Sequence, residues 1–290
     1  MILIAESGST KSDWVLLDAK GREIDRWNTM GFNPYFHSAD LVHEKLTSTD
    51  GLRVWAEKIE QTWFYGAGCS SDDLKATIKE GLDRVFVNAT NHVGHDLEAA
   101  AYALYEGEPE IACILGTGSN SCHFDGCSVS EEVPSLAYIL GDEGSASFIG
   151  KRIVADYLYK RLPDPLQSDF ERTYKLSKDD IIRSVYNKPF ANVYLAGFGP
   201  FAGKHSDHPY IKGLVKEGFS KFIEIHVMCF DDAPYVPVSF VGSVAKIYED
   251  ILTECLNDFG LRKGQVLAKP VNHLIQYHVN FLKVLELQKH

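Results

Sequence analysis

The chain has 290 residues and a formal net charge of −11, and 45% of its residues are hydrophobic while 24% are charged. These fractions are ordinary for a folded globular protein, and the length allows one large domain or two of average size. The negative charge argues against nucleic acid or an anionic membrane as a partner, because both would repel the protein.

The sequence indicates neither an export signal nor a membrane span. The opening segment MILIAES becomes acidic too early for a signal peptide, and no uncharged apolar run approaches the roughly 20 residues that cross a bilayer. The six cysteines are scattered without a Cys-x-x-Cys pair, so buried reduced thiols are the simplest interpretation. We therefore expect a cytoplasmic protein.

Apolar patterns and turn signals predict the secondary structure of the first half. Strands are expected over 2–5, 13–17, 22–28, 62–65 and 85–87, and helices over 38–46, 70–84 and 95–105. Ser38 and the pair Ser70-Ser71 are expected to cap the first two helices.

The second half restarts with another strand pair. Strands are expected over 111–115, 120–124, 128–132, 237–241 and 265–268, and helices over 143–160, 165–174, 177–186, 190–198, 206–230, 243–259 and 272–287. This order predicts an α/β architecture with an internal repeat.

No low-complexity linker separates the two halves, so the boundary is expected between strands, near 107–112. We predict a first domain over 1–110 and a second over 111–271. The final helix, 272–290, is a segment that could pack back on the first domain.

Two turns of small residues each follow an apolar strand. The first is Gly8-Ser9-Thr10-Lys11 and the second is Gly116-Thr117-Gly118-Ser119. Backbone amides in such turns, with nearby hydroxyls and an ammonium, suit phosphate oxygens. A plain hairpin turn is the alternative for either one alone, and neither has the spacing of a Walker A loop. Two in one chain favour a pair of phosphate-binding turns.

Three acidic positions could carry chemistry. Glu6 ends the first strand, where a carboxylate could hold Mg²⁺ or could simply face solvent. Asp96 begins an Ala-rich helix and could accept a proton or only cap the helix. Asp142, next to Gly141, opens another helix and could bind sugar hydroxyls or serve as a favourable helix start.

Two further glycine motifs follow. Gly242-Ser243-Val244-Ala245 joins a strand to a helix without bulk, so an adenine ring could lie against it, or it could be a close turn only. The Gly197-x-Gly199 motif is rejected as a dinucleotide site, because Pro200 interrupts it and no strand precedes it.

Six stretches of the chain together resemble the BadF/BadG/BcrA/BcrD ATPase family, and within it the N-acetylglucosamine kinase-like branch of the sugar kinase, Hsp70 and actin group. They are ESGSTKSDW at 6–14, GFNP at 31–34, HD at 95–96, ILGTGSNS at 114–121, LGDEGSA at 140–146 and FVGSVA at 240–245. The resemblance implies an α/β fold of two ribonuclease H-like domains, with an internal duplication, an ATP cleft between them and closure on substrate.

The resemblance also implies roles for the candidate residues. Residues 8–11 and 116–119 match the phosphate loops, and residues 242–245 match a segment near adenosine. Asp96 matches the catalytic base, and Asn33 and Asp142, with Gly141 beside it, match sugar-binding positions. The implied reaction uses ATP and Mg²⁺ to phosphorylate the 6-hydroxyl of an amino sugar, with N-acetylglucosamine favoured.

One departure from the family pattern concerns the metal. The first strand of the family usually ends in Asp, and this chain has Glu6. The extra methylene would move the carboxylate by roughly 1 Å, whereas Mg²⁺ requires near-ideal octahedral geometry. Glu6 can serve if it contacts the metal through water, and a direct contact would weaken activity.

Two alternative functions remain open at this point. An ATP-driven activator of a 2-hydroxyacyl-CoA dehydratase would need cysteines for an iron–sulfur cluster, and Cys122 and Cys127 are the nearest candidates. A sugar-binding sensor without catalysis is motivated by Glu6 alone. The sequence does not determine which amino sugar is used, and a homodimer is left open.

Overall fold

The computed structural model describes the backbone of residues 1–287. Side chains are described for residues 1–280. The chain forms two compact units. Unit 1 comprises Met1–Ala103 and the segment that starts at Pro270, and unit 2 comprises Leu104–Lys269. None of the helices within residues 1–287 is long and apolar enough to cross a membrane.

The division falls between Ala103 and Leu104, a few residues before the expected boundary at 110. The intervening segment is attached to unit 2: the rings of Tyr105 and Phe124 lie 5.1 Å apart, and Arg262 forms an ion pair with Glu108 at 2.9 Å. A ring contact and an ion pair between residues far apart in the chain leave no periodic apolar pattern, so the sequence did not reveal them.

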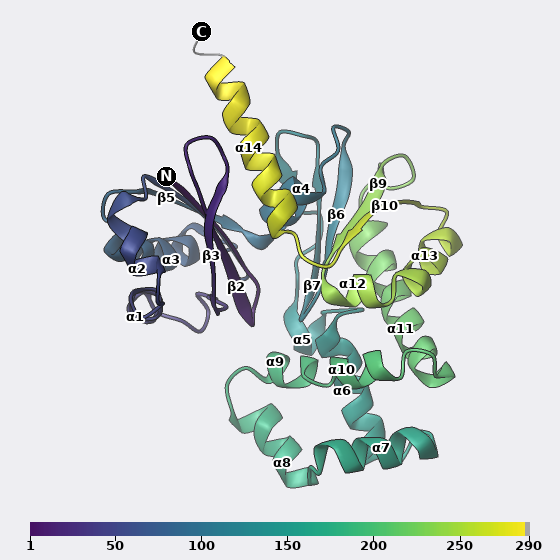
Figure 1. Ribbon diagram of the computed structural model, residues 1–290. Coiled ribbons are helices and arrows are strands. Elements are labelled where there is room, and N and C mark those ends of the chain that lie inside the picture. Colours follow the sequence, from purple (N-terminus) through teal and green to yellow (C-terminus); the bar gives the residue numbers. More distant parts are fainter. Residues whose placement is uncertain (288–290) are drawn as a thin grey trace. The chain divides into compact units, whose positions relative to one another are not determined.

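Unit 1 is a five-stranded sheet with helices on both faces (Figure 1). The strand order is β3-β2-β1-β4-β5, in which β2 is antiparallel to β1 and β3, while β1, β4 and β5 are parallel. Its elements are β1 (Ile2–Ser7), β2 (Lys11–Leu17), β3 (Glu23–Met30), α1 (Ala39–Thr47), α2 (Leu52–Trp55), a 3₁₀ turn (Ala56–Lys58), β4 (Gln61–Gly66), α3 (Asp72–Val85), β5 (Thr90–His95), α4 (Asp96–Leu104) and α14 (Val271–Leu287).

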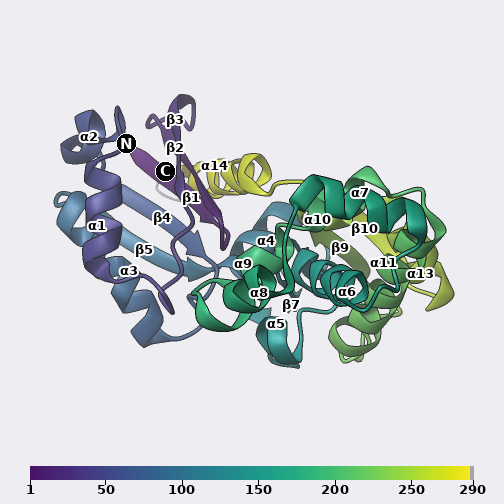
Figure 2. The same ribbon diagram turned by 90° about the horizontal axis from the view of Figure 1, so that it is seen from below.

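Alternating residues of β1 divide between two apolar layers of unit 1, as a period of two requires. Leu3 packs with residues of α1 and α3, which lie together beside the sheet in Figure 2. Ile4 faces the other way and packs with Ala99 of α4 and Leu274 of α14. The last helix therefore covers one face of this sheet. The last three residues of the predicted segment 272–290 lie outside the described residues.

Unit 2 repeats the same sheet (Figure 1). Its strand order is β8-β7-β6-β9-β10, and the directions match those of unit 1 strand for strand. The strands are β6 (Glu110–Leu115), β7 (Ser119–Phe124), β8 (Val129–Ser130), β9 (Pro237–Val241) and β10 (Arg262–Leu267). The predicted α/β fold with an internal duplication is confirmed.

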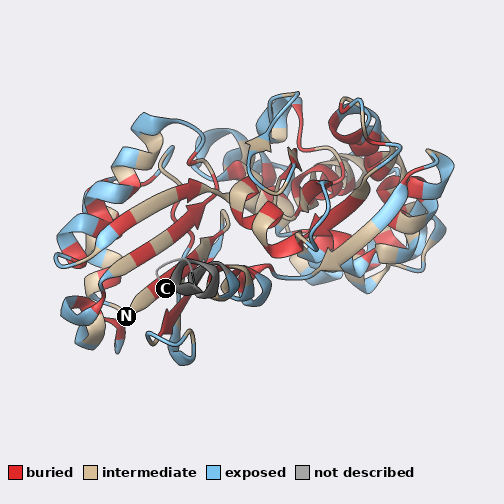
Figure 3. Cartoon of the chain, turned by 90° about the horizontal axis from the view of Figure 1, so that it is seen from above, coloured by how far each residue is buried: buried red, intermediate tan, exposed pale blue. Residues whose placement is uncertain are grey.

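The two sheets differ in what connects their strands. A long helical insertion separates β8 from β9 in unit 2: α5 (Ala137–Leu140), α6 (Ala146–Leu158), α7 (Asp164–Tyr174), α8 (Lys178–Ile182), a π turn (Arg183–Asn187), α9 (Ala191–Ala196), α10 (Gly199–Lys204), α11 (Pro209–Phe222) and a second π turn (Ile223–Val227). Helices α12 (Ser243–Ile247) and α13 (Glu249–Asp258) join β9 to β10. Buried residues follow the strands and the inner faces of these helices (Figure 3).

Several predicted elements needed correction. Val85 ends α3 and no strand covers 85–87; the strand is Thr90–His95 instead. That strand was missed because its sequence, TNHVGH, is mostly polar. The predicted helix over 206–230 begins at Pro209, and the one over 243–259 is interrupted at Tyr248. The predicted caps Ser38 and Ser71 are confirmed, since each side chain accepts a backbone N–H of its helix.

Candidate active site

The carboxyl ends of three parallel strands meet at one edge of the sheet in unit 1. Ser7 of β1 pairs with Gly66 of β4, and Gly66 pairs with His95 of β5. The residues that follow these three are therefore neighbours at the same edge, where open α/β sheets bind ligands. The structure brings the first small-residue turn and Asp96 to this edge.

The first turn is a tight hairpin between β1 and β2. The amide of Gly8 donates to the carbonyl of Lys11 at 3.0 Å, which places Ser9 and Thr10 at the tip. Thr10 and Lys11 are exposed. The small residues predicted to bind phosphate thus lie at the surface.

Gly31 supports this turn from behind. A Cβ on Gly31 would lie 2.0 Å from the carbonyl oxygen of Gly8, so the two backbones are in direct contact. Below it, the buried hydroxyl of Ser7 accepts the amide of Phe32 at 2.9 Å and lies 2.7 Å from the hydroxyl of Ser12. The GFNP segment is therefore fastened to the turn.

Asn33, the predicted sugar-binding residue of this segment, lies against the loop after β4. Its Oδ1 accepts the amide of Tyr35 at 3.0 Å, and a Cβ on Gly68 would come within 2.5 Å of that oxygen. The backbone amide of Asn33 donates a hydrogen bond to Nδ1 of His37 at 3.1 Å. Burial lowers the pKa of His37, which keeps the imidazole neutral and able to accept. Asn33 thus belongs to the same edge of the sheet.

Asp96 is the first residue of α4, directly after β5. Its Oδ1 lies 3.1 Å from Nε2 of His95. Two residues further along the helix, Oε1 of Glu98 accepts the amide of His95 at 3.0 Å and Nζ of Lys75 at 3.3 Å. Both Asp96 and His95 are partly exposed. The site therefore contains Glu98 and Lys75, which the sequence analysis missed. A Glu three residues after the residue that precedes a helix often accepts the backbone N–H of that residue, as Glu98 does from His95. This spacing is the signal by which the sequence could have indicated Glu98.

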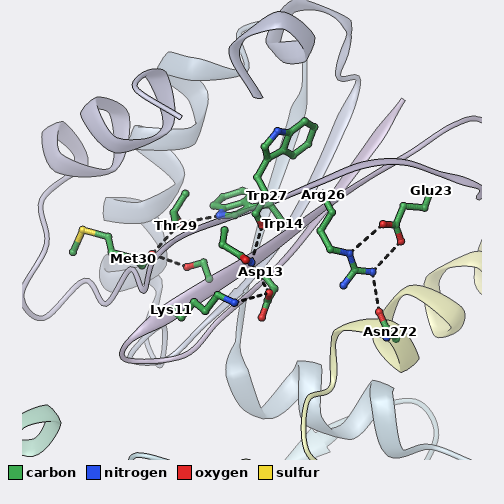
Figure 4. A network of polar contacts seen from close by, with 11 residues as sticks. Lys11, Asp13, Trp14, Glu23, Arg26, Trp27, Thr29, Met30 and Asn272 are labelled. Atoms are coloured by element: carbon green, nitrogen blue, oxygen red, sulfur yellow. Dashed lines mark hydrogen bonds and ion pairs between the residues drawn. The ribbon is translucent and has the colours of Figure 1, made fainter. Parts of the chain in front are cut away.

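Glu6 has a second carboxylate beside it. It pairs with Asp13 across β1 and β2, and paired residues of neighbouring strands present their side chains to the same face. Oδ1 of Asp13 lies 3.4 Å from Nζ of Lys11 (Figure 4). The same oxygen accepts a hydrogen bond from Nδ2 of Asn28 at 2.5 Å. The ammonium that was predicted to bind phosphate therefore lies beside Asp13, which was not among the predicted site residues.

Two carboxylates make an incomplete metal site. Among residues 1–280, whose side chains the structure describes, no cluster of three or more potential metal ligands is present. Mg²⁺ commonly takes one or two carboxylates and completes its octahedron with water and substrate phosphates. The pair Glu6 and Asp13 fits that mode of binding.

In unit 2, the turn from Gly116 to Ser119 is held by Asp142 and the start of α6. The amides of Ala146 and Ser147 donate to the carbonyls of Gly116 and Thr117 at 2.9 and 3.1 Å. The carboxylate of Asp142 accepts the amide of Ser119 at 3.2 Å and the hydroxyl of Ser147 at 3.1 Å. The second turn is thus fixed to the amino end of a helix, a place that favours anions.

Asp142 itself is buried, and Gly141 beside it is buried too. Burial raises the pKa of Asp142, and hydrogen bonds from Ser119 and Ser147 oppose the rise. A Cβ on Gly118 would lie 2.8 Å from Oδ1 of this carboxylate. Whatever else it binds, Asp142 holds the second turn in place.

Gly242 lies beside the second turn. Gly242 follows β9, in which Val241 pairs with Ile114 of β6. The φ of Gly242 is +129°, and a Cβ at this position would lie 2.1 Å from the carbonyl oxygen of Leu115. Both the backbone conformation and the close packing therefore require glycine. Val244 and Ala245 are buried in the core. Gly242 is half-buried and Ser243 is exposed.

Solved structures share the fold of this chain. A protein named "putative N-acetylglucosamine kinase" from Porphyromonas gingivalis is 40% identical, with a TM-score of 0.91 over 97% of this chain and 99% of that one. A second protein of that name, from Chromobacterium violaceum, is 15% identical, with a TM-score of 0.75 over 95% of this chain and 98% of that one.

A ROK family glucokinase from Streptomyces griseus, solved with glucose and AMPPNP, is 15% identical and has a TM-score of 0.54 over 95% of this chain and 97% of that one. At such low identity, the second and third comparisons show a shared fold. Neither a family model nor a curated protein matches the chain. The 40% identity to the first protein over nearly its full length shows that the chain belongs to the N-acetylglucosamine kinase-like family of sugar kinases.

Proposed function

We propose that the protein transfers the γ-phosphate of ATP to the 6-hydroxyl of an amino sugar, with N-acetylglucosamine as the favoured acceptor. The observation that carries this proposal is the 40% identity to the Porphyromonas gingivalis protein over 97% of the chain. Turns of small residues in both copies of the sheet support it. The six free cysteines agree with a cytoplasmic location, where ATP is available.

The phosphates of ATP are assigned to the two turns. Residues Gly8 to Lys11 and residues Gly116 to Ser119 offer backbone amides, hydroxyls and the Lys11 ammonium. Glu6 would hold Mg²⁺, with Asp13 as the neighbouring carboxylate. When bound, the metal neutralises charge on the β- and γ-phosphates. Gly242 and Ser243 would contact adenosine.

Asp96 is assigned as the general base. The sugar 6-oxygen attacks the γ-phosphorus, the bond from that phosphorus to the oxygen bridging it to the β-phosphate breaks, and ADP leaves. The proton of the 6-hydroxyl passes to the carboxylate of Asp96. Phosphoryl transfer depends mainly on alignment and charge stabilisation, so one positioned carboxylate is sufficient as base.

The sugar is assigned to Asn33, Gly141 and Asp142. The amide of Asn33 offers both donors and an acceptor to sugar hydroxyls. The carboxylate of Asp142 accepts two hydrogen bonds within the protein, which leaves further lone pairs for a hydroxyl.

The acceptor can be identified by product analysis. Purified protein with ATP and Mg²⁺ is offered N-acetylglucosamine, N-acetylmannosamine, glucosamine and glucose in parallel, and the product is examined by ³¹P NMR. We expect a 6-phosphate monoester that forms fastest from N-acetylglucosamine. Faster reaction with another sugar would change the assigned acceptor, and binding of sugar without any phosphate ester would contradict the kinase and favour a sensor.

A further inference from the structure

The junction between β5 and α4 is fixed from several sides. The amide of His95 is held by Glu98, and Glu98 is held by Lys75 of α3. A Cβ on Gly94 would lie 2.7 Å from the ring of Tyr65 and 2.9 Å from Oε2 of Glu98. The backbone that carries His95 therefore has little freedom to move.

The imidazole of His95 makes its contact with the carboxylate that follows it. Nε2 of His95 lies 3.1 Å from Oδ1 of Asp96, so the imidazole and the carboxylate are in direct polar contact. The two side chains are 14% and 22% exposed, so water competes only in part.

We propose that His95 is the positioning residue of the catalytic base: contact with its imidazole holds the carboxylate of Asp96 in one orientation. This inference rests on the proposed function, because it concerns the same base. It adds a residue that neither the phosphate turns nor the sugar-binding positions include.

The other charged and titratable groups near Asp96 do not replace this contact. Lys75 of α3 and Glu98 of α4 form an ion pair with each other. Burial, together with the charge of Asp96, raises the pKa of Cys69 to about 12, so its thiol is neutral near pH 7. His95 is the group whose contact with Asp96 the structure shows directly.

The test compares His95→Leu with His95→Gln. Leu removes the hydrogen-bond donor, whereas the amide of Gln offers an N–H at nearly the reach of Nε2. His92→Gln is the matched control, because His92 lies on the same strand and stacks on Trp63 at 4.0 Å. kcat, KM for ATP and for the sugar, and the melting temperature are measured for all three variants and the wild type.

We expect His95→Leu to lower kcat by about 10²-fold, the loss that a small misplacement of a reacting group can cause, with little change in KM for ATP. His95→Gln should recover most of kcat, and His92→Gln should match the wild type. Equal losses in the Leu and Gln variants would overturn the positioning role.

Failures of the two proposals are distinguishable. An active wild type with an unaffected His95→Leu variant overturns the role of His95 alone. An inactive wild type overturns the proposed function and this role with it. If His95→Leu does not fold, ¹⁵N NMR of the imidazole in wild type and Asp96→Asn gives the result: a ring whose Nε2–H tautomer loses population in the variant supports the contact, and an unchanged ring contradicts it.

Discussion

Gly31 and Gly8 are in backbone contact, with 2.0 Å between the place of a Cβ on Gly31 and the carbonyl oxygen of Gly8. The contact joins the end of β3 to the turn between β1 and β2. It explains physically why a glycine opens the GFNP segment, since a side chain would push the turn out of place.

The first prediction concerns this contact. Gly31→Ala should lower the melting temperature and raise KM for ATP, because the added methyl displaces the first turn. Gly8→Ala is the control for stability, since its Cβ would meet its nearest atom at 3.8 Å. Thermal unfolding of both variants checks the prediction, and equal melting temperatures would contradict it.

A second prediction concerns Asp142. Asp142→Ala leaves the amide of Ser119 and the hydroxyl of Ser147 without their acceptor, and each such buried group costs about 1–3 kcal/mol. We expect a lower free energy of unfolding and weaker ATP binding. Asp142→Asn keeps one acceptor and can donate to the hydroxyl, so it should lose less. Denaturant titration ranks the two, and a more stable Ala variant would show that the carboxylate does not hold the turn.

A third prediction concerns pH and Glu110, which is 2% exposed at the start of β6. Burial raises its pKa to about 7, a hydrogen bond from Ser239 opposes the rise, and Glu106 and Glu108 add to it. A carboxyl with a raised folded-state pKa binds more protons when folded. Below pH 4.5, the ordinary pKa of this carboxyl in the unfolded chain, Glu110 therefore has no effect on the free energy of unfolding. As pH rises from there toward 7, the free energy of unfolding falls by at most about 3 kcal/mol.

Glu110→Gln should flatten this dependence between pH 5 and pH 8, because the amide does not ionise. Glu108→Gln should change the dependence much less, since Glu108 is exposed, pairs with Arg262 and is the smallest of the named causes of the raised pKa. The free energy of unfolding is measured at pH 5 and at pH 8 for the wild type and both variants. The same slope in Glu110→Gln and wild type would show that Glu110 does not cause it.

A fourth prediction concerns the metal. Glu6→Gln removes a charge from the pair with Asp13, so kcat should fall by about 10²-fold and the Mg²⁺ concentration for half-maximal rate should rise. Glu6→Asp keeps the carboxylate and should stay closer to the wild type. A Mg²⁺ titration of all three proteins is the measurement, and a Gln variant indistinguishable from wild type would exclude Glu6 from metal binding.

The sequence predicted the repeated sheet because each copy opens with an apolar strand, a small-residue turn and a second strand. It could not predict β5, whose polar residues give no alternation, and it therefore separated Asp96 from the strand that places it. The order of the motifs predicted the place of Asp96 better than the apolar pattern did, because the pair His95-Asp96 lies where β5 ends and α4 begins.

Contacts between side chains that are far apart in the chain were beyond the sequence patterns. Nothing in the residues around Lys75 indicates that it reaches Glu98, and the pairing of Glu6 with Asp13 depends on the register of β1 and β2. Asp142 was predicted to bind sugar, and its hydrogen bonds to Ser119 and Ser147 became visible in the structure alone.

In the proposed reaction, Asp96 accepts the proton of the sugar hydroxyl during phosphoryl transfer. The most direct measurement is ADP release with and without N-acetylglucosamine, for the wild type and for Asp96→Asn, at saturating ATP and Mg²⁺. We predict sugar-dependent release by the wild type and a loss of at least about 10²-fold in the variant, whose amide cannot take the proton. Sugar-dependent release that persists undiminished in Asp96→Asn would contradict the account.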